Sequence, residues 1–376
     1  MDRLGDTIAG LAKRRVLRAT ASGRNGGDRL MDLVGYGSNP GALRSKYYVP
    51  DTLDKGAPLV VILHGCTQSA AAYDHGSGWS QLADELGFAL LFPEQQRSNN
   101  LNLCFNWFES ADVRRGSGEA LSIRQMIAEM SARHDVDPNR IFVTGLSAGG
   151  AMASGMLATY PEVFAGGAII AGLPFGCASS VREAFVRMQG HGYPTDKHLG
   201  TLVRDASPHR APWPRISIWQ GDADTTVDPS NAKRLVGQWR AVHGLDGRPS
   251  ELDKAKGYSR QIWRDDAGRP AIEFNTIMGM GHGTPVTTVG PDACGASGPF
   301  MLETGISSTR HIAGFWGLTA AAPMRAPPPS AVAFSPEPAH VPVPLAADMA
   351  PGTPTRTAKG VGAIIEDALR AAGLMR

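Results

Sequence analysis

Ser147 is the residue whose surroundings in the sequence most clearly suggest chemistry. It stands in GLSAG at 145–149, the one G-x-S-x-G in the chain. The β-favouring run 141–144 precedes it, and small residues suited to a tightly packed helix follow it at 149–161. On such a sharp strand-to-helix turn a serine hydroxyl projects above the sheet, and side chains two positions to either side would clash. We therefore predict a nucleophile here; the alternative is a small residue in an inert turn.

A serine nucleophile needs a base to take its proton and an acid to orient that base. On turns of this kind the partners follow along the chain in the order serine, acid, histidine. His282 lies in the glycine-rich loop GMGHGTP, directly after a predicted strand, and is our candidate base. Three aspartates follow the preceding predicted strand, and Asp224 is our candidate acid. Of the other two, Asp222 is better suited to forming a turn and Asp228 to capping a helix.

The charge that develops on the substrate's carbonyl oxygen needs two converging backbone N–H groups. We expect one from Ala148 and the other from the loop LHGCTQ, where the amide of Cys66 can point toward the site. His64 in this loop is predicted to bond the loop backbone and not to act as a base. We expect no cofactor, and no metal either, because the cysteines are too far apart in sequence to resemble a zinc site.

Elements that could position these residues run from about residue 47 to 318, where short apolar runs alternate with helix-like segments. Such alternation predicts an α/β fold with a doubly wound, mostly parallel sheet. Helices are expected at 119–135 and 149–161, and one further helix-like pattern ends at Gly87. The predicted strands are 58–65, 88–94, 141–144, 167–172, 216–220 and 271–277.

Composition divides the 376-residue chain further. We predict an N-terminal amphipathic segment at 1–44, a catalytic domain at 45–320, a proline-rich linker at 321–356 and an amphipathic C-terminal helix at 357–376. The linker is placed there because residues 321–355 hold ten of the 27 prolines. A net charge of +2 gives no reason to expect a nucleic-acid partner, and no apolar run is long enough to span a membrane.

The four cysteines allow three disulfide pairings. We prefer Cys66 with Cys104 and Cys177 with Cys294, since these two bridges would staple loops around the candidate site. Four reduced thiols are the alternative.

Six motifs taken together resemble a known family. HGCTQSAAAYD, CFNWF, GLSAGGAMA, GLPFGCA, GDADTTVDP and GMGHGTP occur in this order within residues 45–318 and are similar to the esterase family of polyhydroxybutyrate depolymerases, to which feruloyl and acetylxylan esterases are related. The resemblance implies an α/β-hydrolase fold and hydrolysis of a short-chain polyester through an acyl-enzyme. It implies Ser147, Asp224 and His282 as the triad and Cys66 as an oxyanion residue.

The motif CFNWF matches a segment that lines the site in this family. Trp107 and Phe108 are therefore our candidate substrate-binding residues, because they could present an apolar wall to methyl-bearing acyl units. Plain core packing is the alternative for both.

The function we expect is a serine esterase that hydrolyses poly(3-hydroxybutyrate) or its oligomers. A feruloyl or acetylxylan-type carboxylesterase is the alternative within the same chemistry, and a polymer- or granule-binding protein with an inactive hydrolase fold is the alternative outside it. The resemblance favours an extracellular location. The N-terminal MDRLGDTIAGLAKRRVLRAT does not resemble a secretory signal, however, so a cytoplasmic location stays open, as does the oligomeric state.

Overall fold

A ten-stranded sheet organises the protein, whose computed structural model describes residues 29–319 apart from 246 and 256. The strand order is β1-β2-β4-β3-β5-β6-β7-β10-β9-β8. The six central strands are parallel, and antiparallel pairs close both edges. The strands are β1 Met31–Asp32, β2 Arg44–Tyr48, β3 Leu59–Leu63, β4 Ala89–Glu94, β5 Ile141–Leu146, β6 Gly166–Ile170, β7 Arg215–Gly221, β8 Glu251–Ala255, β9 Tyr258–Arg264 and β10 Pro270–Ile277, with a separate parallel pair β11 Thr284–Val286 and β12 Met301–Glu303.

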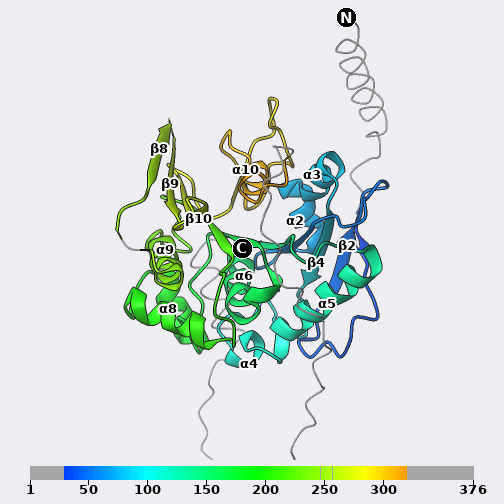
Figure 1. The fold of residues 1–376 in the computed structure, drawn as a ribbon, viewed down its shortest axis with the longest axis horizontal. Coiled ribbons are helices and arrows are strands. Elements are labelled where there is room, and N and C mark those ends of the chain that lie inside the picture. Colours follow the sequence, from blue (N-terminus) through cyan, green and yellow to red (C-terminus); the bar gives the residue numbers. More distant parts are fainter. Residues whose placement is uncertain (1–28, 246, 256, 320–376) are drawn as a thin grey trace, which may run out of the picture.

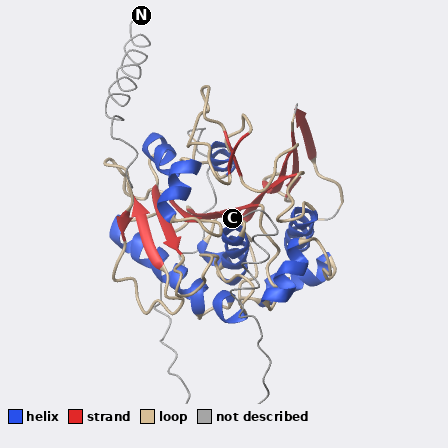
Figure 2. Ribbon diagram, turned by 180° about the vertical axis from the view of Figure 1, so that it is seen from behind, coloured by secondary structure: helices blue, strands red, loops and turns tan. Residues whose placement is uncertain are grey.

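Helices cover both faces of the sheet (Figures 1 and 2). Helices α4, α5, α6, α8 and α9 contribute to the core on one face, and α2, α3 and α10 contribute to the core on the other. The helices are α2 Ala70–Ser77, α3 Trp79–Leu86, α4 Ser110–Val113, α5 Gly118–His134, α6 Ala148–Thr159, α7 Val181–Met188, α8 Asp196–Asp205, α9 Ser230–His243 and α10 Ser308–Phe315, with a 3₁₀ turn at Pro161–Val163.

Strand β3 is apolar along its whole length because both of its faces are covered. In β3, Leu59, Val61 and Leu63 belong to the core on one face, while Val60 and Ile62 belong to the core on the other. Successive side chains of a strand point to opposite faces, so one continuous apolar run serves both cores. Helix α6 is fully buried, since its alanines and glycines allow it to lie close against the sheet.

The predicted doubly wound, mostly parallel sheet is confirmed, and all six predicted strands are present with small differences at their ends. The predicted helix ending at Gly87 is confirmed as α3, whose C-cap is Gly87, and a second helix, α2, precedes it. The chain turns between them at Gly78, whose φ is +74°. The antiparallel edge strands were not predicted.

The predicted terminal segments stay predictions. Residues 1–28 of the N-terminal segment, the proline-rich linker and the C-terminal helix lie outside the described residues, and residues 31–32 and 44–48 form the edge strands β1 and β2. Within the described part of the chain, no helix is long and apolar enough to cross a membrane.

Candidate active site

Ser147 lies on the sharp turn between β5 and α6 with a φ of +57°, a backbone conformation that non-glycine residues rarely adopt. Its N–H donates to the carbonyl of Ile170 at 2.9 Å, which fixes the turn against β6. A Cβ on Gly149 would lie 2.2 Å from the carbonyl oxygen of Leu63, and one on Gly145 would lie 2.4 Å from the backbone of Gly149. The glycines are therefore required by close backbone contact around the serine.

His282 and Asp224 come from loops that follow the neighbouring parallel strands β10 and β7. His282 Nδ1 lies 2.8 Å from Asp224 Oδ2, and their side chains are only 7% and 0% exposed. The two loops can approach because Gly221 ends β7, where a Cβ would lie 2.1 Å from the carbonyl oxygen of Met280. The structure thus joins the two residues that we chose as base and acid.

Every oxygen of the Asp224 carboxylate is used. Oδ1 accepts the N–H groups of Thr226 at 2.8 Å and Val227 at 2.9 Å, and Oδ2 accepts Gln220 Nε2 at 2.9 Å beside the His282 contact. An ionised carboxylate only accepts hydrogen bonds, so Nδ1 of His282 carries the proton and Nε2 has the free lone pair. This arrangement leaves the imidazole ready to accept a proton at Nε2.

Ser147 and His282 line the same narrow crevice, which has a volume of about 30 Å³. Cys66 lines it too, together with residues that sequence reasoning missed: Gly65, Thr67, Gln68, Leu146, Met188, Thr226 and Phe300. Met188 is the last residue of α7, and the Phe300 ring lies edge-on to His282 with 6.3 Å between ring centroids. No sequence motif indicates Met188 or Phe300 as site residues, because the segments that carry them contain none of the motifs around Ser147, Asp224 or His282.

The two candidate oxyanion donors lie on opposite sides of Ser147 in the sequence. Ala148 begins α6, so its amide is one of the first four that have no acceptor within the helix. Cys66 lines the crevice from the loop after β3. The predicted backbone role of His64 is confirmed: Nδ1 is 2.8 Å from the carbonyl oxygen of Gly65, and Nε2 accepts the N–H of Gln95 at 3.1 Å.

Trp107 and Phe108 are not among the residues that line the crevice. Trp107 is half-buried and belongs to the same apolar cluster as Met188. Phe108 is 7% exposed and packs edge-on against Trp107, with 5.5 Å between ring centroids. Of the pair, Trp107 is therefore the one whose side chain retains solvent access.

The unselected aspartates have backbone partners. Asp222 Oδ1 accepts the N–H of Gly279 at 2.6 Å and fixes the turn before His282. Asp228 Oδ1 accepts the N–H of Ser230 at 2.8 Å at the start of α9. Asp222 thus has the turn role expected of it, whereas the capping role expected of Asp228 is wrong, because Pro229 is the N-cap of α9 and Asp228 stands one residue before it.

One of the two expected disulfides is present. Cys66 is bonded to Cys104, which ties the loop after β3 to the segment before Trp107. The pairing of Cys177 with Cys294 is wrong, because both are buried free thiols in different apolar clusters. Sequence spacing does not report which loops meet, and burial raises the pKa of each thiol to about 12, so neither is a thiolate at neutral pH.

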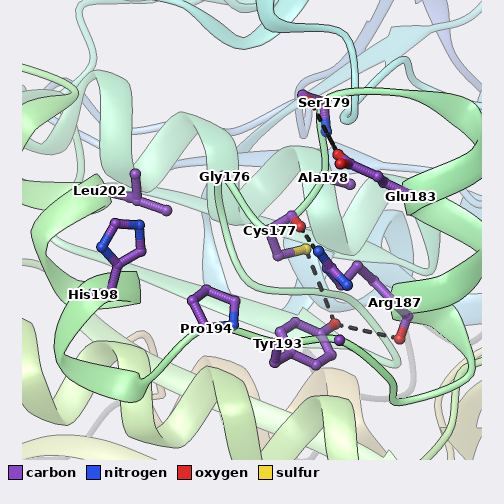
Figure 3. Close-up of a pocket in the computed structure, with 11 residues that line it drawn as sticks. Gly176, Cys177, Ala178, Ser179, Glu183, Arg187, Tyr193, Pro194, His198 and Leu202 are labelled. Carbon is purple, nitrogen blue, oxygen red and sulfur yellow. Dashed lines mark hydrogen bonds between the residues drawn. The ribbon is translucent and has the colours of Figure 1, made fainter.

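Cys177 lines a separate pocket of about 390 Å³ between the loop 176–179, α7 and α8 (Figure 3). Its sulfur lies 4.0 Å from the hydroxyl of Tyr193, and its carbonyl oxygen accepts Arg187 Nε at 2.8 Å. The pocket contains neither Ser147 nor His282, so it is not the candidate catalytic site.

Removal of the Cys66–Cys104 bridge should lower stability. The two cysteines are 38 positions apart, and releasing a loop of that length should cost about 4 kcal/mol in the free energy of unfolding. The measurement is urea denaturation of the Cys66→Ser/Cys104→Ser double variant. Reduced wild type should unfold at the midpoint of this variant, and a reductant that lowers the variant's midpoint further would contradict the assignment.

A serine on a strand-to-helix elbow above a mostly parallel sheet, with an acid and a histidine from the following strands, defines the α/β-hydrolase fold. Residues 43–250 match the family model described as esterase PHB depolymerase, and the chain belongs to this family. It is accordingly a carboxylic ester hydrolase.

The chain is also similar in sequence to two individual relatives and in fold to one solved structure. The chain is 46% identical over 291 residues to poly(3-hydroxyalkanoate) depolymerase C of Paucimonas lemoignei, covering 77% of this chain and 70% of the relative. It is 31% identical to a probable acetylxylan esterase A of Aspergillus fumigatus, with 68% and 70% covered. An acetyl xylan esterase structure from Aspergillus awamori superposes with a TM-score of 0.66 at 24% identity, covering 77% of this chain and 99% of that one, and it shows the shared fold.

Proposed function

We propose that the protein hydrolyses ester bonds of poly(3-hydroxybutyrate) or its oligomers through an acyl-enzyme formed on Ser147. The observation that carries the proposal is the His282–Asp224 pair, 2.8 Å apart, whose imidazole shares a crevice with the serine of the elbow. The 46% identity to a protein named as a poly(3-hydroxyalkanoate) depolymerase supports the choice of substrate.

In the acylation step, Nε2 of His282 takes the proton of the Ser147 hydroxyl as its oxygen attacks the ester carbonyl. Asp224 holds the imidazole through Nδ1 and stabilises the imidazolium that forms. The amides of Cys66 and Ala148 donate to the oxyanion of the tetrahedral intermediate. The C–O bond then breaks, and the leaving alkoxide takes the proton from Nε2 and departs as an alcohol.

In the deacylation step, His282 takes a proton from water, which attacks the acyl carbonyl in the same crevice. The second tetrahedral intermediate collapses, Ser147 regains its proton from Nε2, and a 3-hydroxyacid leaves. Trp107, supported by Phe108, would extend the apolar wall that Met188 begins, where acyl methyl groups can pack.

Product analysis tests the substrate. Purified protein is incubated with poly(3-hydroxybutyrate) film, with its soluble oligomers, with an acetylated xylan and with a feruloyl ester. We expect 3-hydroxybutyrate and short oligomers from the first two. Faster release of acetate or ferulate would instead favour the second candidate, which the 31% identity to an acetylxylan esterase supports.

Met188→Ala should broaden the acyl groups that are accepted. Met188 lines a crevice of only about 30 Å³, so we expect truncation of its side chain to make room for longer acyl chains. The ratio of kcat/KM for p-nitrophenyl hexanoate over acetate should rise roughly tenfold. Val186→Ala is the matched control, because Val186 is exposed on the same helix and does not line the crevice; an unchanged ratio in Met188→Ala would contradict this assignment.

A further inference from the structure

Glu119 carries a buried carboxyl group that the proposed mechanism does not use. It is the second residue of α5 and is 1% exposed. The ion pairs of residues 29–319 include none to Glu119. Burial of an acid without a cation is costly, and here burial, with the nearby Asp112, raises the pKa of Glu119 to about 8. An apolar residue would avoid this cost, so the contacts of Glu119 need an explanation.

Its two oxygens hold two different segments. Oε1 accepts Gln95 Nε2 at 2.6 Å, and Oε2 accepts the backbone N–H of Asn106 at 3.0 Å. Gln95 lies directly after β4, and Asn106 belongs to the segment that Cys104 ties to Cys66. The Glu119 side chain therefore connects the end of β4 to the 104–106 segment.

Gln95 extends this connection to the loop after β3. Its Nε2 also donates to the carbonyl of Cys104 at 3.1 Å, and its backbone N–H donates to His64 Nε2 at 3.1 Å. Because Nε2 accepts, the proton of His64 must be on Nδ1, from which it is donated to the carbonyl of Gly65 at 2.8 Å. Burial lowers the pKa of His64 and keeps the ring neutral in this arrangement.

The two paths from Glu119 meet at Cys66. One runs through Gln95 and His64 to Gly65, the residue before Cys66. The other runs through the 104–106 segment and the disulfide to the Cys66 side chain. We propose that Glu119 is a positioning residue that holds the Gly65–Cys66 backbone in place for oxyanion stabilisation. The inference rests on the proposed function, because it assigns Cys66 N–H to the oxyanion.

Glu119→Gln is the most direct test. Both groups facing the carboxyl are N–H donors, and a glutamine offers one acceptor oxygen and one NH₂ that cannot accept. One of the two segments therefore loses its anchor with almost no change in side-chain volume. Glu129→Gln on the same helix, where the half-buried side chain pairs with Arg133, is the matched control.

Kinetics on p-nitrophenyl butyrate separates positioning from loss of structure. We expect kcat of Glu119→Gln to fall roughly 10- to 100-fold with KM within about twofold, because a displaced oxyanion donor affects the transition state more than substrate binding. The inhibition constant of a boronic acid, which mimics the tetrahedral intermediate, should rise by a similar factor. Glu129→Gln should match wild type in all three quantities.

Gln95→Met removes the connecting amide and should lower kcat in the same way. If Glu119 acts through Gln95, the effects of the two substitutions will not add in the double variant. If Glu119→Gln does not fold, kcat and the boronate inhibition constant are instead compared between Gln95→Met and wild type. Additive losses, or a fall in stability with unchanged kcat, would overturn the inference.

The pH dependence of stability identifies the carboxyl itself. The folded-state pKa of about 8 lies above the ordinary value of 4.5, so the unfolded chain loses its proton first. The thermal unfolding midpoint of wild type should therefore fall, relative to that of Glu119→Gln, as pH rises from about 5 to about 8. Asp112 is the other acid that faces this group, and burial raises its pKa too. Because Asp112 is present in both proteins, its effect is common to both. If the unfolding midpoints of the two proteins change identically with pH, the raised pKa of the Glu119 carboxyl group is contradicted.

Failure of this inference is distinguishable from failure of the proposed function. If wild type hydrolyses the ester and Glu119→Gln is equally active, only the positioning role is lost. If wild type itself neither hydrolyses the ester nor reacts with a fluorophosphonate at Ser147, the proposed function fails first.

Discussion

Ser147→Ala should reduce kcat for a p-nitrophenyl ester by about 10⁶-fold, because the acyl-enzyme can no longer form. The substitution removes the hydroxyl and leaves the backbone unchanged. Alanine has a Cβ like serine, so the strain of the +57° φ is already present, and the N–H bond to Ile170 does not involve the side chain. The variant should consequently keep the wild-type unfolding midpoint within a few degrees.

Ser154→Ala is a control on the same helix. Ser154 is fully buried in α6, and its hydroxyl has no hydrogen-bond partner among the described residues. It should keep full activity and full labelling by a fluorophosphonate, while Ser147→Ala should lose both. Substantial turnover by folded Ser147→Ala would contradict the proposed mechanism, since no other serine stands in a G-x-S-x-G motif in this sequence.

The sheet and the nucleophile could be predicted from short stretches of sequence. A parallel strand buried on both faces is rich in apolar residues, so a continuous apolar run such as that in 58–65 indicates a central strand. The elbow requires glycine where its backbone approaches β3, so the glycines around Ser147 indicate this close backbone contact in the sequence itself. The choice of His282 and Asp224 used the chain order of serine, acid and histidine, together with the composition of the loops after the predicted strands.

Residues that meet only in three dimensions could not be predicted. Met188 and Phe300 reach the crevice from α7 and from the segment before β12, and neither carries a pattern that indicates a site. Glu119 looks like an ordinary acid in the first turn of a helix until its burial is known. The wrong pairing of Cys177 with Cys294 has the same origin, because spacing along the chain says nothing about which loops pack together.

Asp224→Asn should lower kcat by about 10⁴-fold through the tautomer of His282. The backbone N–H groups of Thr226 and Val227 both point at Oδ1, so the asparagine must place its carbonyl oxygen there. Its NH₂ then occupies the position of Oδ2, where it faces His282 Nδ1 and Gln220 Nε2. Nδ1 must accept in order to form a hydrogen bond, and the ring proton moves to Nε2, where the base needs a lone pair.

The fold should tolerate this change. The Oε1 atom of Gln220 is buried with no partner among the described residues, so rotation of that amide can offer an acceptor to the new NH₂. Asp222→Asn is the matched control, because its side chain keeps an oxygen for the N–H of Gly279 and should leave kcat within a few-fold of wild type. Steady-state kinetics with thermal unfolding of both variants decides the assignment: a large loss in Asp222→Asn with an active Asp224→Asn would move the acid from Asp224 to its neighbour.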